Sequence, residues 1–63
     1  MDWTPERIRA LRQKMGLSQR EFAKHINVRQ ATVSDWETGK HPPTGAVLVL
    51  FDMLEKEANR KAD

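Results

Sequence analysis

Residues 17–39 read LSQREFAKHINVRQATVSDWETG and contain the start and end signals of two short helices. Ser18 and Glu21 have the spacing of a capping box, in which each side chain bonds the other residue's backbone N–H. Leu17 and Phe22 occupy the two positions of a hydrophobic staple. The stretch therefore predicts helices over residues 19–26 and 30–38, joined by a tight turn and ended by residues that tolerate a left-handed conformation, Asn27 and Gly39.

The apolar residues of this stretch fall on faces that can meet. They are Phe22, Ala23, Ile26, Val28, Val33 and Trp36. Ala23 is small at the point where two helix axes must approach closely, and a larger side chain there would overpack the crossing. Two short helices joined in this way describe a helix-turn-helix.

A further helix is predicted before this motif, over residues 5–15. Thr4 is a suitable N-cap, Pro5 fits the first helical position, and Trp3 with Ile8 forms a second staple. Ile8, Leu11 and Met15 share one face. Gly16 can supply the left-handed residue that ends the helix.

The last predicted helix spans residues 44–58, after Pro42 and Pro43 break the chain. At 100° per residue its core stripe consists of Val47, Leu50, Phe51 and Leu54. A second apolar flank consists of Ala46, Val49 and Met53. We expect Val49 and Met53 on this flank to form a small two-fold dimer interface, with packing of the N-terminal arm through Trp3 as the alternative.

The chain is expected to be a single all-α domain over residues 1–63, with a frayed C-terminal tail. No stretch alternates with the period of two that a β-hairpin needs. There is no cysteine, and two histidines sixteen residues apart, His25 and His41, make a poor metal-ligand set. No run of residues has the length and hydropathy of a membrane span, and no secretion signal is present, so a cytoplasmic location is expected.

Length and charge restrict the function. A chain of 63 residues leaves no room for a large catalytic cleft, and no catalytic triad or carboxylate pair is suggested by spacing, so an enzyme is disfavoured and no cofactor is expected. The formal net charge is only +2, but residues 7–41 hold eight Lys or Arg against three acidic residues, an excess of five positive charges. On charge alone, this uneven distribution is as compatible with a solvated helical surface as with a nucleic-acid partner.

The motif as a whole resembles the helix-turn-helix domains of the phage repressor and Cro family. The matching residues are Leu17-Ser18-Gln19-x-x-Phe22-Ala23 and Val28-x-x-x-Thr32-Val33-Ser34-x-Trp36-Glu37-x-Gly39-x-x-x-Pro43. This resemblance implies a compact four- to five-helix bundle of the lambda-repressor-like type. The segment Pro43-Thr44-Gly45-Ala46 before one apolar helix also looks like antitoxin-type regulators.

The resemblance implies a DNA-binding protein whose third helix enters the major groove. If Val33 and Trp36 point inward, the side chains available to contact bases are Gln30, Ala31, Ser34 and Asp35. Glutamine can bond adenine at N6 and N7, alanine can contact a thymine methyl, and a carboxylate can accept from an exocyclic amine. Gln30 is therefore expected to be the main direct reader.

Phosphate contacts are expected from residues around these readers, namely Gln19, Arg20, Arg29, Thr32 and Lys40, with His41 and Lys24 as further candidates. By resemblance, Gln19 also braces Gln30. The family usually has Ser or Thr where this chain has Arg29, so the cap of the third helix is weakened while a cation is gained. The family pattern also implies a structural ion pair between Arg12 and Glu37.

The leading hypothesis is a sequence-specific regulator of transcription, acting as a repressor that binds double-stranded DNA as a homodimer on a palindromic site. Repression by steric occlusion is expected, because so short a chain leaves no sensing or activation domain. The alternative is an antitoxin or adaptor module whose main partner is a protein.

Overall fold

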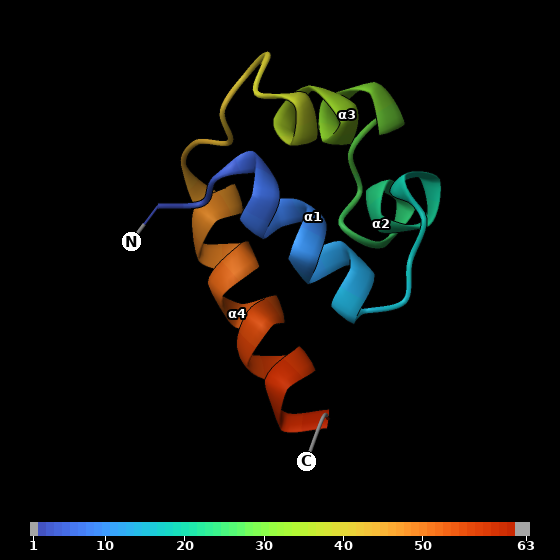
Figure 1. Ribbon diagram of the computed structural model, residues 1–63, viewed down its shortest axis with the longest axis vertical. Coiled ribbons are helices and arrows are strands. Elements are labelled where there is room, and N and C mark those ends of the chain that lie inside the picture. Colours follow the sequence, from blue (N-terminus) through green and yellow to red (C-terminus); the bar gives the residue numbers. More distant parts are fainter. Residues whose placement is uncertain (1, 62–63) are drawn as a thin grey trace.

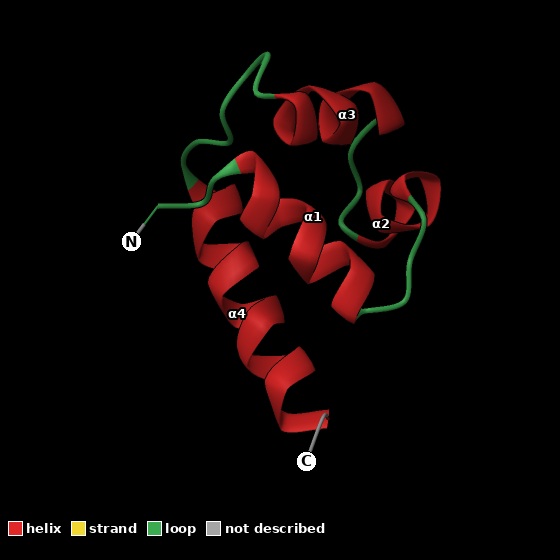
Figure 2. Cartoon of the chain, in the orientation of Figure 1, coloured by secondary structure: helices red, strands yellow, loops and turns green. Residues whose placement is uncertain are grey.

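The computed structural model describes residues 2–61, which form four α-helices and no strand (Figure 1, Figure 2). They are α1 (Pro5–Lys14), α2 (Gln19–His25), α3 (Gln30–Thr38) and α4 (Ala46–Lys61). The predicted all-α fold is confirmed, with four helices rather than five. None of the described helices is long and apolar enough to cross a membrane.

The helices begin at the caps that the sequence indicates. The Thr4 hydroxyl accepts a bond from the Arg7 N–H at 3.2 Å. At the start of α2, the Glu21 N–H donates to the Ser18 hydroxyl at 3.1 Å, and the Ser18 N–H donates to Glu21 Oε1 at 2.8 Å, so the expected capping box is present. Hydrogen bonds to these charged or polar caps satisfy backbone donors that have no partner within the helix.

The helix ends differ from the predicted bounds by one to three residues. α1 and α2 each end one residue early, because Met15 and Ile26 serve as C-caps. α4 begins at Ala46 and not at residue 44, because Gly45 has a φ of +65°, which lies outside helical geometry. It continues past residue 58 to Lys61, since Asn59 and Arg60 extend a segment without Gly or Pro. The rest of the predicted frayed tail lies outside the described residues.

α1 lies between α4 on one side and the α2–α3 pair on the other (Figure 1). The buried core takes residues from all four helices and from the arm before α1, namely Trp3, Ile8, Leu11, Phe22, Ala23, Val33, Trp36 and Phe51. Phe51 lies at the centre of an aromatic cluster, with ring centroids 5.2 Å from Trp3, 6.2 Å from Phe22 and 5.3 Å from Trp36. One residue of α4 thus fixes that helix against the motif.

The core stripe of α4 is only partly as predicted. Phe51 is fully buried, and Val47 and Leu54 pack against the core, but Leu50 does not. Leu48 and Ala58 pack there instead. Leu48 lies four residues before Asp52, the residue that Trp3 bonds, and is therefore on the side of α4 that the arm before α1 approaches.

The arm is fixed to α4 by polar contacts. The Trp3 Nε1–H donates to Asp52 Oδ1 at 2.9 Å. The guanidinium of Arg7 stacks over the Trp3 ring at 4.0 Å and bonds the Glu55 carboxylate at 3.1 Å. α4 is therefore held to the rest of the domain on the side away from Val49 and Met53, which are 60% and 62% exposed.

Candidate nucleic-acid interface

α3 has one buried side and one outward side. Val33, Trp36 and Glu37 are buried, whereas Gln30 and Ala31 are exposed. The other two expected base contacts, Ser34 and Asp35, are half-buried. None of the four expected base contacts is buried, and the most exposed of them, Gln30 and Ala31, lie in the first turn of α3.

Exposed cationic residues precede and follow α3 along the chain. Arg20 on α2, Arg29 before α3 and Lys40 after α3 are all exposed, while Thr32 is half-buried. Because a cation in solvent is free to meet a phosphate, Arg20, Arg29 and Lys40 remain suitable phosphate contacts. Lys24 and His41 are exposed as well.

Arg29 occupies the N-cap position of α3 and makes no side-chain cap bond. Its carbonyl accepts from the N–H groups of Thr32 and Val33, at 3.0 and 3.3 Å. The first backbone donors of α3 therefore lack the hydroxyl or carboxylate acceptor that Ser or Asp would supply. α3 therefore begins with an N-cap residue whose side chain makes no capping bond and carries an exposed positive charge.

Arg12 and Glu37 are in direct contact and join α1 to α3. Arg12 Nε lies 2.6 Å from Glu37 Oε2, and Arg12 Nη2 lies 3.0 Å from Oε1, so the pair is bidentate. Arg12 Nη1 also donates to the Leu17 carbonyl at 3.0 Å. Two parallel N–H···O bonds fix both distance and orientation, so this pair fixes the orientation of α3 relative to α1.

Two more residues reach the same carboxylate. Gln19 Nε2 donates to Glu37 Oε1 at 3.2 Å, and Arg9 Nε lies 3.5 Å from that oxygen. Arg9 Nη2 also donates to the Glu37 carbonyl at 3.2 Å. Three helices, α1, α2 and α3, therefore meet at one buried acidic side chain, which we call the Glu37 cluster (Arg9, Arg12, Gln19 and Glu37).

The Gln19 side chain has a different bonding partner from the one expected. The resemblance implied that Gln19 braces Gln30, but its amide is bonded to Glu37 near the other end of α3. Arg9 was not expected at this site at all. Its spacing of three residues from Arg12 places both on one face of α1, which is the signal in the sequence that indicates a second cation near Glu37.

Opposing effects act on the Glu37 carboxyl. Burial raises its pKa, but the hydrogen bonds from Arg12 and Gln19, the charge of Arg12 and the bond from Arg9 outweigh burial and hold the pKa below its ordinary value of 4.5. The same contact raises the pKa of the Arg12 guanidinium. Glu37 is therefore ionised and fully paired, which is the condition under which a buried charge can be tolerated.

His25 and His41 are both exposed. Within residues 2–61, no three His, Cys, Asp or Glu side chains are close enough to hold a metal ion.

A short helix with an outward polar face, held by a tight turn against a preceding helix, defines the helix-turn-helix class of DNA-binding domains. A family model described as helix-turn-helix matches residues 8–51, more than half of the chain. The chain belongs to this family, of the Cro/C1 type, and is a DNA-binding regulator of transcription. Members of this family generally act without catalysis. Searches of curated proteins and of solved structures gave no match.

Proposed function

We propose that the chain is a sequence-specific repressor that binds a palindromic operator as a dimer. The observation that carries this proposal is the outward side of α3, where Gln30 and Ala31 are exposed beside Arg29. In this proposal the base contacts come from Gln30, Ala31, Ser34 and Asp35. The phosphate contacts come from Gln19, Arg20, Arg29, Thr32 and Lys40.

Gln30 is the side chain best suited to direct readout. It is the first residue of α3 and is exposed, so its amide can bond an adenine edge when the start of α3 enters the major groove. Asp35 would accept from a base amine and repel nearby phosphates, which disfavours loose binding to other sequences. Bound at a promoter, such a domain represses by occupying the site.

In vitro site selection followed by titration of Gln30→Ala and Arg29→Ala tests the base-reading assignment. Gln30→Ala should relax discrimination at one base position by about 1–3 kcal/mol. Arg29→Ala should instead weaken binding to all sequences and lower the salt slope by about one unit. If both variants lost the same affinity for the selected site and for random DNA, Gln30 would not be a base reader.

The proposed dimer interface lies on α4. A single helix-turn-helix contacts few base pairs, so two copies on a two-fold site supply the specificity that one lacks. Val49 and Met53 are the large apolar side chains exposed in the described part of the chain, at 60% and 62%. They are therefore available to a second copy.

Sedimentation equilibrium of Met53→Asp tests the dimer. The variant should sediment as a monomer where the unmodified chain is a dimer. Ala10→Asp, which places the same charge on an exposed position of α1, is the matched control and should leave the dimer intact. An unmodified chain that stays monomeric at all concentrations, with or without operator DNA, would rule out the dimer.

The exposed apolar surface of α4 also supports a second candidate function. In this candidate the chain is an antitoxin or adaptor, and another protein, such as a toxin, binds that surface. This candidate and the dimer differ in one result. A chain that is monomeric alone and gains stability only with a co-expressed neighbouring gene product would favour the antitoxin role.

A further inference from the structure

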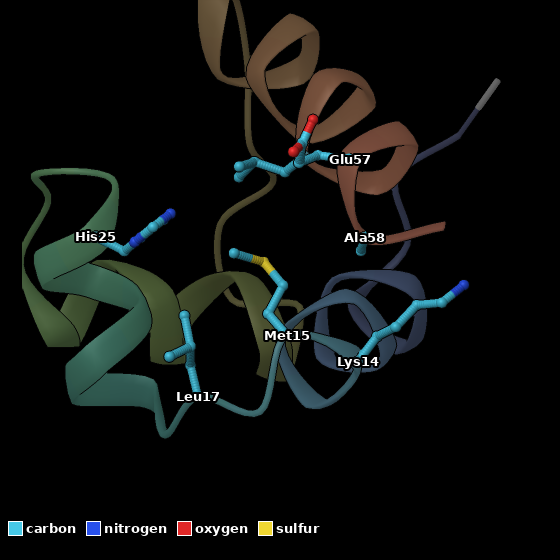
Figure 3. A pocket seen from close by; sticks show the side chains of 7 residues that line it. Lys14, Met15, Leu17, His25, Glu57 and Ala58 are labelled. Carbon is cyan, nitrogen blue, oxygen red and sulfur yellow. The ribbon is translucent and has the colours of Figure 1, made fainter. Parts of the chain in front are cut away.

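A groove lies between the ends of α1 and α2 and the C-terminal half of α4, with a volume of about 260 Å³. Its apolar floor is formed by Met15, Leu17, Leu54 and Ala58. Figure 3 shows the side chains of Met15, Leu17 and His25 directed towards the same space. All four floor residues also pack against the core, so the groove is part of the folded domain and not a loose surface feature.

The groove continues the exposed apolar surface of α4. Leu50, Met53, Leu54 and Glu57 follow the spacing i, i+3, i+4 and i+7, which places them along one side of a helix. Leu54 and Glu57 line the groove, and Met53 lies beside them. The surface proposed for dimerisation and the groove are therefore neighbours on one helix.

The area that a stable dimer buries indicates that the interface includes both the exposed apolar surface of α4 and the groove. A stable, specific interface buries roughly 800 Å² on each partner, and the whole chain exposes 4549 Å². Two side chains, Val49 and Met53, cannot supply an area of that order. The groove is the apolar surface directly beside them.

We propose that in the dimer each copy inserts its Met53 side chain into the groove of the other copy. This inference rests on the proposed dimer and adds how its two copies recognise each other. A two-fold axis makes the contact reciprocal, so both grooves are filled by the same residue. Methionine suits an irregular groove because its side chain is long, unbranched and adaptable, whereas Val49 is short and stiff at χ1 and suits contact between the helix surfaces.

Charges at the rim of the groove agree with this occupant. Glu57 is exposed at the rim, opposite Lys14 and His25. Lys56 is exposed and lies three residues after Met53, on the adjacent turn of α4. When Met53 of one copy enters the groove, its Lys56 can meet Glu57 of the other copy, which gives the interface a favourable charge contact.

Cross-linking between single-cysteine chains tests the proposal, and the absence of native cysteine makes every cross-link assignable. A Met53→Cys chain is mixed with an equal amount of a His25→Cys chain and treated with a short bismaleimide, whose spacer replaces the lost length of the methionine. A covalent product joining the two kinds of chain is expected, identified by mass. Lys24→Cys, on the neighbouring exposed residue outside the groove, replaces His25→Cys in the control and should give no such product.

The other outcomes separate this inference from the proposed function. Cross-links only between two Met53→Cys chains would show that the two α4 helices meet face to face, which overturns the groove contact and keeps the dimer. A dimer by sedimentation without any cross-link through position 53 also overturns the groove contact. An unmodified chain that sediments as a monomer overturns both proposals. Circular dichroism of each variant should show the helix content of the unmodified chain, because the substituted positions are exposed.

Discussion

Arg12 Nε lies 2.6 Å from Glu37 Oε2, and this contact joins α1 to the recognition helix α3. Among residues 2–60, whose burial the structure describes, Glu37 is the one buried charged residue, with 3% of its surface exposed. A charge removed from water in this way is tolerated only while its partners remain in place. The contact therefore couples the stability of the domain to the orientation of the surface proposed to face DNA.

Replacing Glu37 by Ala should destabilise the domain by about 3–5 kcal/mol, because Arg12 is then left partly buried without its counter-charge. The free energy of unfolding from urea titration is the measurement. Asp2→Ala removes a carboxylate from an exposed position of the arm before α1 and should change stability by no more than about 0.5 kcal/mol. Similar losses for both variants would show that the buried position of Glu37 is unimportant.

The stability of the domain should fall in acid partly through Glu37. The pKa of Glu37 in the folded chain is below its ordinary value of 4.5, so its contribution to stability is present above pH 4.5 and is lost as the pH falls through the folded pKa. The pKa of Glu21 is also lowered, by its bonds with Ser18, and acts in the same direction. Urea titrations between pH 6 and pH 3 should therefore show a smaller acid loss for Glu37→Gln, which keeps the Glu21 contribution. An unchanged acid loss in Glu37→Gln would assign it to other carboxylates.

Enlarging Ala23 should disturb the crossing between α2 and α3. Ala23 is buried, and its carbonyl accepts from the Val28 N–H at 2.9 Å in the turn that follows. Ala23→Leu should cost about 1–3 kcal/mol by overpacking. Thermal unfolding gives the stability, and operator titration should show reduced affinity because α3 is displaced. Ala10→Leu, at an exposed position of α1, is the matched control.

Arg29 should show opposite effects on stability and on DNA binding. Arg29→Ser supplies the side-chain acceptor that the N-cap of α3 lacks, which should stabilise the domain by about 1 kcal/mol. It also removes an exposed cation, so affinity for all DNA sequences should fall. Arg29→Ala should reproduce the loss of affinity without the gain in stability. A serine variant that binds DNA as tightly as the unmodified chain would exclude Arg29 as a phosphate contact.

Sequence patterns predicted the parts of this fold that depend on neighbours within one or two turns. The cap at Thr4, the capping box of Ser18 and Glu21, and the buried stripe of α3 all follow from spacings of three or four residues. The start of α4 was misplaced because a helical pattern alone did not show that Gly45 takes a left-handed conformation.

Contacts between distant residues were harder to predict. The bond from Trp3 to Asp52 spans 49 positions, and it depends on how the arm crosses α4, which no local pattern encodes. The Arg12–Glu37 contact was expected only through the family resemblance, and the attachment of Gln19 and Arg9 to the same carboxylate was missed. A buried carboxylate has more acceptor positions than one arginine fills, so further donors nearby are a physical expectation once its burial is known.

The Glu37 cluster has a consequence for how such a regulator can change its target. The α3 side chain that bonds α1 and α2, Glu37, is buried, whereas none of the four proposed base contacts is buried, so the two sets share no residue. Because Gln30 and Ala31 are exposed, replacing either should change the proposed base contacts and leave the Glu37 cluster intact. Under the proposed function, a lineage carrying this domain can acquire new operators through substitutions at exposed positions of α3 alone, while the Glu37 cluster stays unchanged.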